Sequence, residues 1–143
     1  TARCPAGGGT CTDTNTLVVM VDGADWTPAS AGFFRATDVN SLVVIGTDAG
    51  PPSSQVSIVV HGVTGVGTYA VDPGCDYVRN DDTTFSVPSG AVSAGTLTLE
   101  GFTYTDDGFL NDCFRGSFDV TFTNGAATKH VQGTFDLSKL PAL

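Results

Sequence analysis

The aspartates are the residues of this chain with the most obvious capacity for chemistry. Every acidic residue except Glu100 is Asp. A glycosidase needs two carboxylates about 5 to 10 Å apart across a cleft, one of them with a raised pKa. Most of these Asp residues instead stand in turn-like stretches beside Gly, Pro or Asn, where an Asp side chain bonds its own backbone. The sequence therefore predicts turn formation in preference to acid–base catalysis.

One oxygen-rich stretch could bind a metal. Asp106 and Asp107 precede a Gly, and Asp112 follows five residues after Asp107. Carboxylate oxygens are the ligands that Ca²⁺ prefers, although the spacing differs from that of an EF-hand loop. We therefore consider a calcium site at Asp106, Asp107 and Asp112, with ordinary turn formation as the alternative. No other cofactor is predicted.

The four cysteines have no C-x-x-C spacing, and three disulfide pairings are open. They are Cys4, Cys11, Cys75 and Cys113. We favour Cys4 with Cys11, which share a short Gly-rich segment, and Cys75 with Cys113, which lie beside predicted strands. Persistent disulfides require an oxidising compartment, so the chain is predicted to be secreted, either extracellular or at a cell surface.

Enzymatic activity is not expected. His61 and His130 are isolated in the sequence, and no G-x-S-x-G or H-E-x-x-H motif accompanies them. We predict no catalytic residue and interpret both histidines as residues at the ends of strands.

Charge and hydropathy argue against nucleic-acid binding and against a membrane-spanning helix. Six Lys and Arg residues stand against 15 acidic residues, for a net charge of −9. Nucleic-acid binding needs clustered basic residues, which the chain lacks. Apolar runs such as 17–21 are far shorter than the roughly 20 residues of a membrane-spanning helix, so no transmembrane segment is predicted. The opening residues of the sequence are typical of a processed N-terminus.

Short β-forming segments separated by turn signals fill the chain after residue 15. No sustained helical period is present, and about nine strands are predicted. They are 17–22, 33–37, 42–46, 55–61, 68–72, 83–87, 96–105, 114–123 and 130–137. The pattern predicts an all-β fold, an antiparallel β-sandwich of immunoglobulin-like or jelly-roll-like topology. Residues 1–15 form a Gly-rich, disulfide-containing arm, and residues 16–143 form the sandwich.

Two glycine patterns stand out. Gly, a small hydroxyl residue and an aromatic residue recur at 67–69, 116–118 and 133–135. We interpret each as a strand entry, where Gly permits a bulge or a close backbone approach and the aromatic ring points into the core. Gly101 interrupts the alternation of its strand and predicts a β-bulge.

The order of short motifs along the chain resembles an uncharacterised family of bacterial β-sandwich domains found in secreted proteins and lipoproteins. The motifs are Val21-Asp22-Gly23 followed by Trp26, a strand ending in Gly46, Gly67-Thr68-Tyr69, Gly95-Thr96-Leu97-Thr98-Leu99, Gly116-Ser117-Phe118 and Val131-Gln132-Gly133-Thr134-Phe135. The resemblance covers most of 17–137. It implies the fold and a surface location, but no activity.

Two functions follow as expectations. The first is a non-enzymatic extracellular structural protein that assembles with copies of itself into a filament or coat through β-strand contacts. Its candidate assembly strand is the β-forming run of Leu17, Val18, Val19, Met20 and Val21, with an ordinary first strand of its own sandwich as the alternative. The alternative is a glycan-binding module with Trp26 as a stacking platform, although a single Trp after a first strand is more often part of the core.

Overall fold

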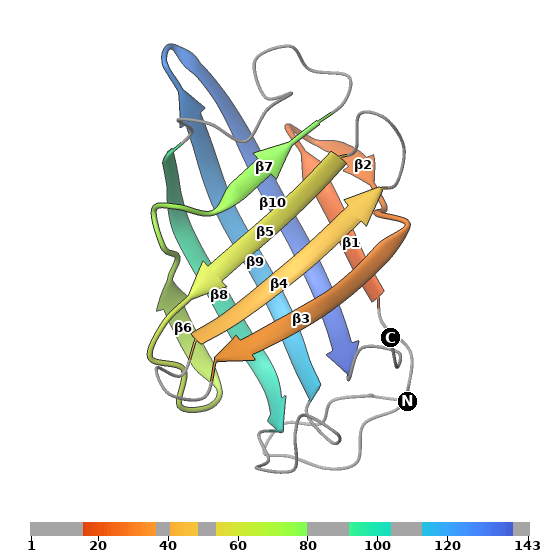
Figure 1. The fold of residues 1–143 in the computed structure, drawn as a ribbon, viewed down its shortest axis with the longest axis vertical. Helices are drawn as coiled ribbons and strands as arrows, with labels where there is room; N and C mark the ends of the chain where they lie inside the picture. Colours follow the sequence, from red (N-terminus) through yellow and green to blue (C-terminus); the bar gives the residue numbers. More distant parts are fainter. Residues whose placement is uncertain (1–15, 37–40, 49–53, 80–91, 104–112, 139–143) are drawn as a thin grey trace.

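The computed structural model describes residues 16–36, 41–48, 54–79, 92–103 and 113–138. These residues form two antiparallel β-sheets packed face to face, which confirms the predicted all-β sandwich (Figure 1). The ten strands are β1 (Thr16–Val21), β2 (Ala24–Trp26), β3 (Ser30–Ala36), β4 (Ser41–Asp48), β5 (Ser54–Val60), β6 (Gly67–Ala70), β7 (Asp76–Val78), β8 (Val92–Thr103), β9 (Cys113–Asn124) and β10 (Ala127–Ser138). None of the described residues lies in a helix of the length and hydropathy needed to cross a membrane.

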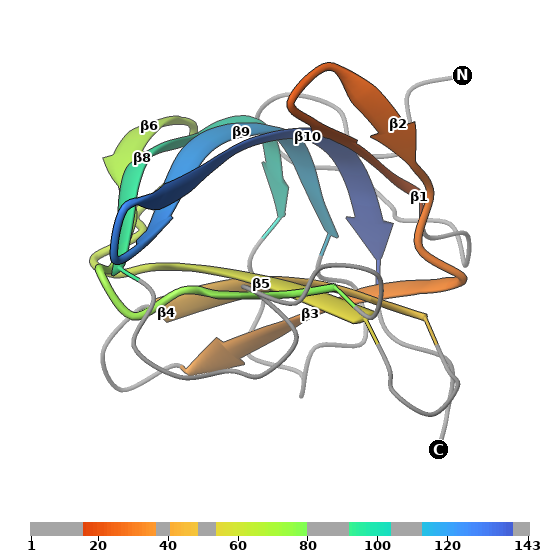
Figure 2. The ribbon, with the colours of Figure 1, turned by 90° about the horizontal axis from the view of Figure 1, so that it is seen from above.

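The two sheets differ in size and curvature. The larger has the order β2-β1-β10-β9-β8-β6, and the smaller has the order β3-β4-β5-β7. Figure 2 shows the six-stranded sheet arching over the flatter four-stranded one. Strands β8, β9 and β10 form a long meander, and β1 adds to its far side by pairing with β10.

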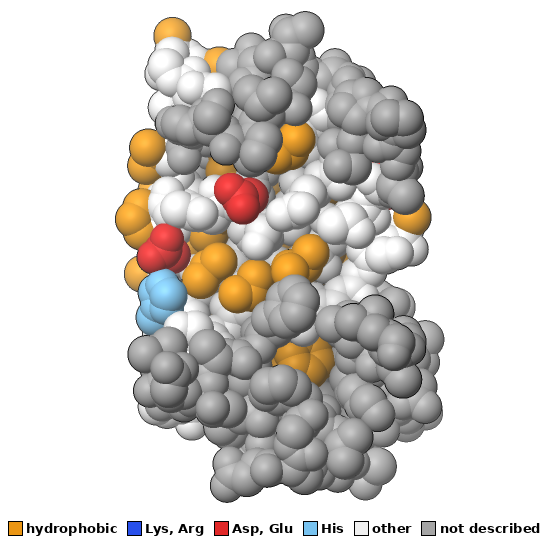
Figure 3. Space-filling model, viewed as in Figure 1, with side chains coloured by type: hydrophobic (Ala, Val, Ile, Leu, Met, Phe, Trp, Pro, Cys, Tyr) orange, Lys and Arg blue, Asp and Glu red, His pale blue; other side chains and the backbone are white. Residues whose placement is uncertain are grey.

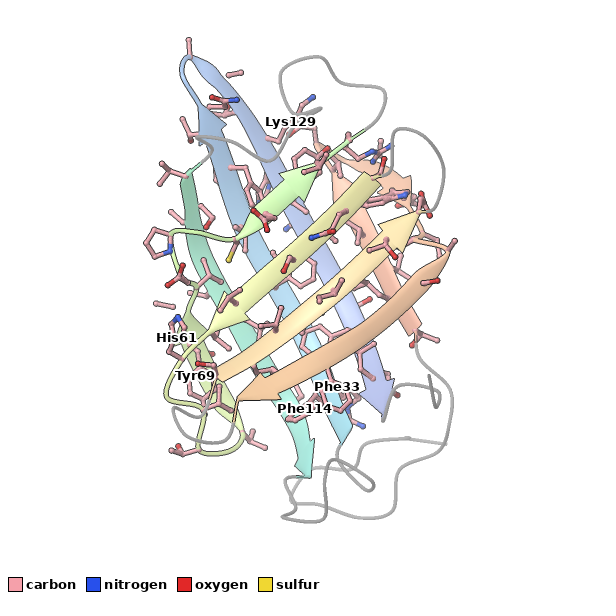
Figure 4. The ribbon with its side chains drawn as sticks, in the orientation of Figure 1. Phe33, His61, Tyr69, Phe114 and Lys129 are labelled. Atoms are coloured by element: carbon pink, nitrogen blue, oxygen red, sulfur yellow. The ribbon has the colours of Figure 1, made fainter. Side chains whose placement is uncertain are left out.

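The core lies between the sheets and follows the alternation of each strand. Leu17 and Val19 of β1 point inward, while Val18 between them points outward. Phe33 and Phe114 come from opposite sheets and meet edge to face, with ring centroids 4.8 Å apart (Figure 4). Such aromatic pairs contribute about 0.5 to 1.5 kcal/mol beyond the area that they bury.

The recurring glycine motif has a reciprocal packing role. Antiparallel pairing of β9 with β10 sets Gly116 opposite Phe135 and Gly133 opposite Phe118. Each ring therefore lies over the glycine of the other strand, and the two rings stack with centroids 6.5 Å apart. A Gly two residues before an aromatic residue in both strands is the pattern that this register requires. The predicted close approach is confirmed, but both glycines lie inside strands and not at strand entries.

The predicted and observed strands differ at two short strands, and the structure shows how a bulge and a crossing are formed. The short strands β2 and β7 were not predicted, and the segment 83–87 lies outside the described residues. The bulge at Gly101 is confirmed, because the pairing of β8 with β9 shifts between Leu99 and Gly101. Tyr69 ties the crossing from β5 to β6: its hydroxyl donates to the Gly65 carbonyl at 2.7 Å, as in the tyrosine corners of other sandwiches.

The predicted disulfide between Cys75 and Cys113 is wrong. Cys75 is a buried free thiol whose backbone N–H donates to the Ser93 hydroxyl at 3.0 Å. Ser93 pairs with Phe122, and Cys113 lies nine residues further along the same strand. At about 3.3 Å per residue this separation is about 30 Å, whereas bridged Cα atoms lie within about 7 Å. Cys4 and Cys11 lie outside the described residues.

The interpretation of 17–21 as a strand for donation to a neighbour is also corrected. All six residues of β1 pair with β10 of the same chain, and Val19 to Val21 also pair with β2. The inward side chains of β1 are almost fully buried in its own core. The run is therefore the first strand of its own sandwich, the alternative that its sequence also allowed.

Candidate functional site

The residues singled out in the sequence do not form a common site. Asp106, Asp107 and Asp112 lie outside the described residues, so the calcium site stays a prediction. Within the described ranges, no three His, Cys, Asp or Glu side chains come together as metal ligands.

Trp26 does not form a sugar platform, so that prediction is wrong. It is 8% exposed and belongs to the core, and the Arg79 guanidinium lies 4.4 Å from the centre of its ring. Its indole N–H donates to an Asp48 carboxylate oxygen at 2.6 Å, and the other oxygen of Asp48 accepts from the Ala29 N–H at 2.6 Å. Trp26 and Asp48 thereby anchor the passage from β2 in one sheet to β3 in the other.

A shallow trough on the outer face of the six-stranded sheet is the best candidate site. The part between Val18, Met20 and Asp119 has a volume of about 400 Å³. The site crosses four strands in three rows, each read from β1 to β8. The rows are Met20, Gln132, Asp119 and Thr96; Val18, Thr134, Ser117 and Thr98; and Thr16, Asp136, Arg115 and, at the bulge, Glu100. We call this surface the trough.

The trough has one apolar wall and one polar floor. Val18 and Met20 of β1 are 47% and 40% exposed, respectively, and supply the wall. Strands β8, β9 and β10 supply hydroxyl, amide and carboxylate groups, because their outward positions carry polar residues while the inward ones fill the core. Neighbouring strands lie about 4.8 Å apart and alternate residues about 6.6 Å apart, so these groups form a regular grid.

Asp119 is held in the trough by two side chains of β10. One carboxylate oxygen lies 2.6 Å from Nε2 of His130, and the other accepts from the Gln132 amide at 3.2 Å. Both partners come from β10, which pairs with β9 at this level. The carboxylate is still 56% exposed. Because each carboxylate oxygen can accept more than one hydrogen bond, Asp119 is oriented and retains acceptor capacity toward the trough.

Sequence reasoning missed a second polar cluster, on the other sheet. The Ser41 hydroxyl lies 2.7 Å from Nδ1 of His61, and Nε2 of His61 lies 3.0 Å from an Asp72 carboxylate oxygen. Figure 3 shows His and acidic side chains together at one margin of this face. The only signal in the sequence was the position of His61 at the end of a predicted strand. The register of β4 with β5 brings Ser41 to His61, and the bond from the Asp72 N–H to the Val59 carbonyl at 2.8 Å brings Asp72 there.

We interpret this cluster as structural. Serine hydrolases use the same three residue types, but Ser41 is only 8% exposed, and none of the three residues lines the trough. The cluster links the beginning of β4, the end of β5 and the connection from β6 to β7. The Gly74 N–H also donates to Asp72 at 2.7 Å, which fixes the turn before β7.

This cluster predicts a pH dependence of stability. The bond from the Gly74 N–H, followed by that from His61, lowers the pKa of Asp72 below its ordinary 3.8. A lowered folded-state pKa stabilises the fold above the unfolded value, and that contribution is lost as the pH falls through the folded value. Asp72→Asn should therefore lower the Tm at neutral pH, and the difference from the parent should shrink below about pH 4. Thermal melts from about pH 7 to about pH 2.5 test this, and a constant difference would contradict it.

Comparisons with protein-family models, with curated proteins and with solved structures found no match to this chain. The resemblance to secreted bacterial sandwich domains therefore stays a prediction, and the functional argument depends on the trough itself.

Proposed function

We propose that this chain is a non-enzymatic extracellular protein that binds a glycan in the trough. The observation that carries the proposal is the grid of hydrogen-bonding groups on β8, β9 and β10 beside an exposed apolar wall on β1. The part of the trough between Val18, Met20 and Asp119 has a volume of about 400 Å³, which falls in the range of sites for small ligands, about 300 to 1,000 Å³.

The chemistry of a sugar matches this lining. A sugar ring carries many hydroxyl groups, each a donor and an acceptor, together with patches of C–H groups. Gln132 and the hydroxyls of Ser117 and Thr134 offer donors and acceptors, and Asp119 offers acceptors. Val18 and Met20 offer the apolar contact that an aromatic platform gives in other modules. The proposal thus keeps the predicted ligand class but replaces Trp26 as its contact.

Blocking the middle of the trough tests the proposal. Ser117→Leu removes a hydroxyl from the central row and fills the space above it, so glycan binding should weaken at least about tenfold, a loss of about 1.4 kcal/mol. Thr123→Leu is the matched control, because Thr123 lies on the same face of β9, six residues further along and outside the trough. A glycan array followed by titration calorimetry on the folded proteins measures both.

Binding that survives in Ser117→Leu, or is lost equally in Thr123→Leu, would place the ligand elsewhere. A parent protein that binds no member of a broad array would overturn the proposal itself.

A second proposal, self-assembly, has support from the four-stranded sheet. Strand β3 spans seven residues and pairs only with β4 among the described strands. Val43, Ile45 and Val59 are only half-buried on the outer face, whose centre is hydrophobic in Figure 3. An open edge beside an apolar surface is a place where a second copy can add a strand. Size-exclusion chromatography with negative-stain imaging tests this, and a uniform monomer at high concentration would exclude it.

A further inference from the structure

The trough is charged unevenly. The described part of its lining contains three carboxylates, Asp119, Glu100 and Asp136, and one guanidinium, Arg115. The carboxylates stand at both ends, and the central row between them is uncharged. Among the described lining residues, carboxylates therefore outnumber basic groups, and Asp119 is the charged group of its row.

We propose that the trough selects glycans that carry ammonium groups, which are polymers of deacetylated amino sugars. This inference rests on the proposed glycan-binding function and adds the chemical class of the sugar. An ammonium group offers three donors and no acceptor, whereas a carboxylate accepts only. Asp119, which His130 and Gln132 already hold in place, can receive such a donor without reorganising.

The same geometry rejects acidic sugars. A uronic acid at one end of the trough would set its carboxylate against Asp119. At the other end the carboxylate would meet Glu100 or Asp136. Lys129, on β10 beside His130, does not offset this charge, because its ammonium lies 3.7 Å from an Asp22 oxygen. Figure 4 shows Lys129 near the end of the molecule that holds the β9–β10 hairpin.

The field of the whole chain acts in the same direction. The net charge is −9, and only six residues are Lys or Arg. Such a field raises the local concentration of cationic ligands and lowers that of anionic ones, and added salt screens it. The affinity for an ammonium-bearing glycan should therefore fall as the salt concentration rises, while the affinity for a neutral glycan should change little.

Titration calorimetry with three glycans of matched length tests the inference on the full chain. The probes are a fully deacetylated chitosan hexamer, its N-acetylated counterpart and an oligogalacturonate. We expect the deacetylated hexamer to bind at least about tenfold more tightly than the acetylated one, and the oligogalacturonate not to bind. Asp119→Asn keeps the size of the side chain and removes its charge, so it should abolish most of the preference for the deacetylated hexamer.

Asp25→Asn is the matched control, because Asp25 is an exposed residue on the same sheet that does not line the trough. It makes the same change in net charge and should leave the preference intact. Equal affinity for all three probes, or an equal effect of the two substitutions, would overturn selection by charge but leave glycan binding in place. A preference that persists in Asp119→Asn would assign it to another group. No binding to these probes or to any glycan of the array would overturn the proposed function as well.

Discussion

Gly116→Ala is expected to unfold the protein or to destabilise it by about 3 kcal/mol or more. A Cβ at this position would stand 1.9 Å from the Thr98 carbonyl oxygen of β8 and 3.1 Å from the Phe135 ring. The first obstacle is backbone in the middle of a paired strand, so it cannot rotate away. Because whole domains are stable by only about 5 to 15 kcal/mol, one methyl group here removes a large part of the total. Urea denaturation monitored by circular dichroism measures the loss.

Gly133→Ala provides the contrast. The three atoms nearest to a Cβ there all belong to the ring of Phe118, the closest at 2.3 Å. A smaller side chain at position 118 should relieve that contact, so Phe118→Leu should recover part of the stability lost in Gly133→Ala. Phe135→Leu should not rescue Gly116→Ala, because the Thr98 carbonyl remains. If both double variants recover equally, the backbone of β8 is not the obstacle at Gly116.

Asp48→Ala is expected to cost about 3 kcal/mol, since it removes two hydrogen bonds to a charged acceptor. The indole N–H of Trp26 and the backbone N–H of Ala29 both donate to this carboxylate at 2.6 Å. Trp26 is 8% exposed, so its N–H would lose its partner with little access to water. The Tm of Asp48→Ala should therefore be markedly lower than that of the parent in a thermal melt.

Asp25→Ala is the control for this substitution, because Asp25 is exposed on β2, next to Trp26 in the sequence. It should leave the free energy of unfolding within about 0.5 kcal/mol of the parent. An Asp48→Ala protein that is equally stable would show that Trp26 needs no polar partner to hold the passage between the sheets.

The fold was largely predictable from the sequence because alternation specifies which side chains enter the core. Phe118, Val120 and Phe122 alternate with polar residues, and β9 has that pattern of burial. Strands of three residues, such as β2 and β7, contain too few positions for alternation to be recognised. The distance between Cys113 and Cys75 also depends on strand register, which no local pattern reveals. For this reason the predicted disulfide between them is wrong.

The candidate site was less predictable because it is assembled across strands. Ser117, Thr134 and Thr98 are each an ordinary outward residue in the sequence, and only the pairing of β8, β9 and β10 sets them in one row. The arrangement of these hydroxyls beside Val18 depends on the same pairing, through β10 and β1. The residue type of Trp26 suggested a sugar contact, whereas in the structure Trp26 helps to hold the two sheets together.

The pairing of β1 with β10 has a consequence for how the protein reaches its folded state. Thr16 lies opposite Asp136, so this contact closes a loop of 120 residues. Sandwiches dominated by such distant contacts fold in about milliseconds to seconds, because the entropy of loop closure is lost before the contacts form. During synthesis the first strand must wait for the last, and until β10 is available the inward side chains of β1 have only part of their core. A chain built in this way cannot complete its six-stranded sheet until β10 has been made.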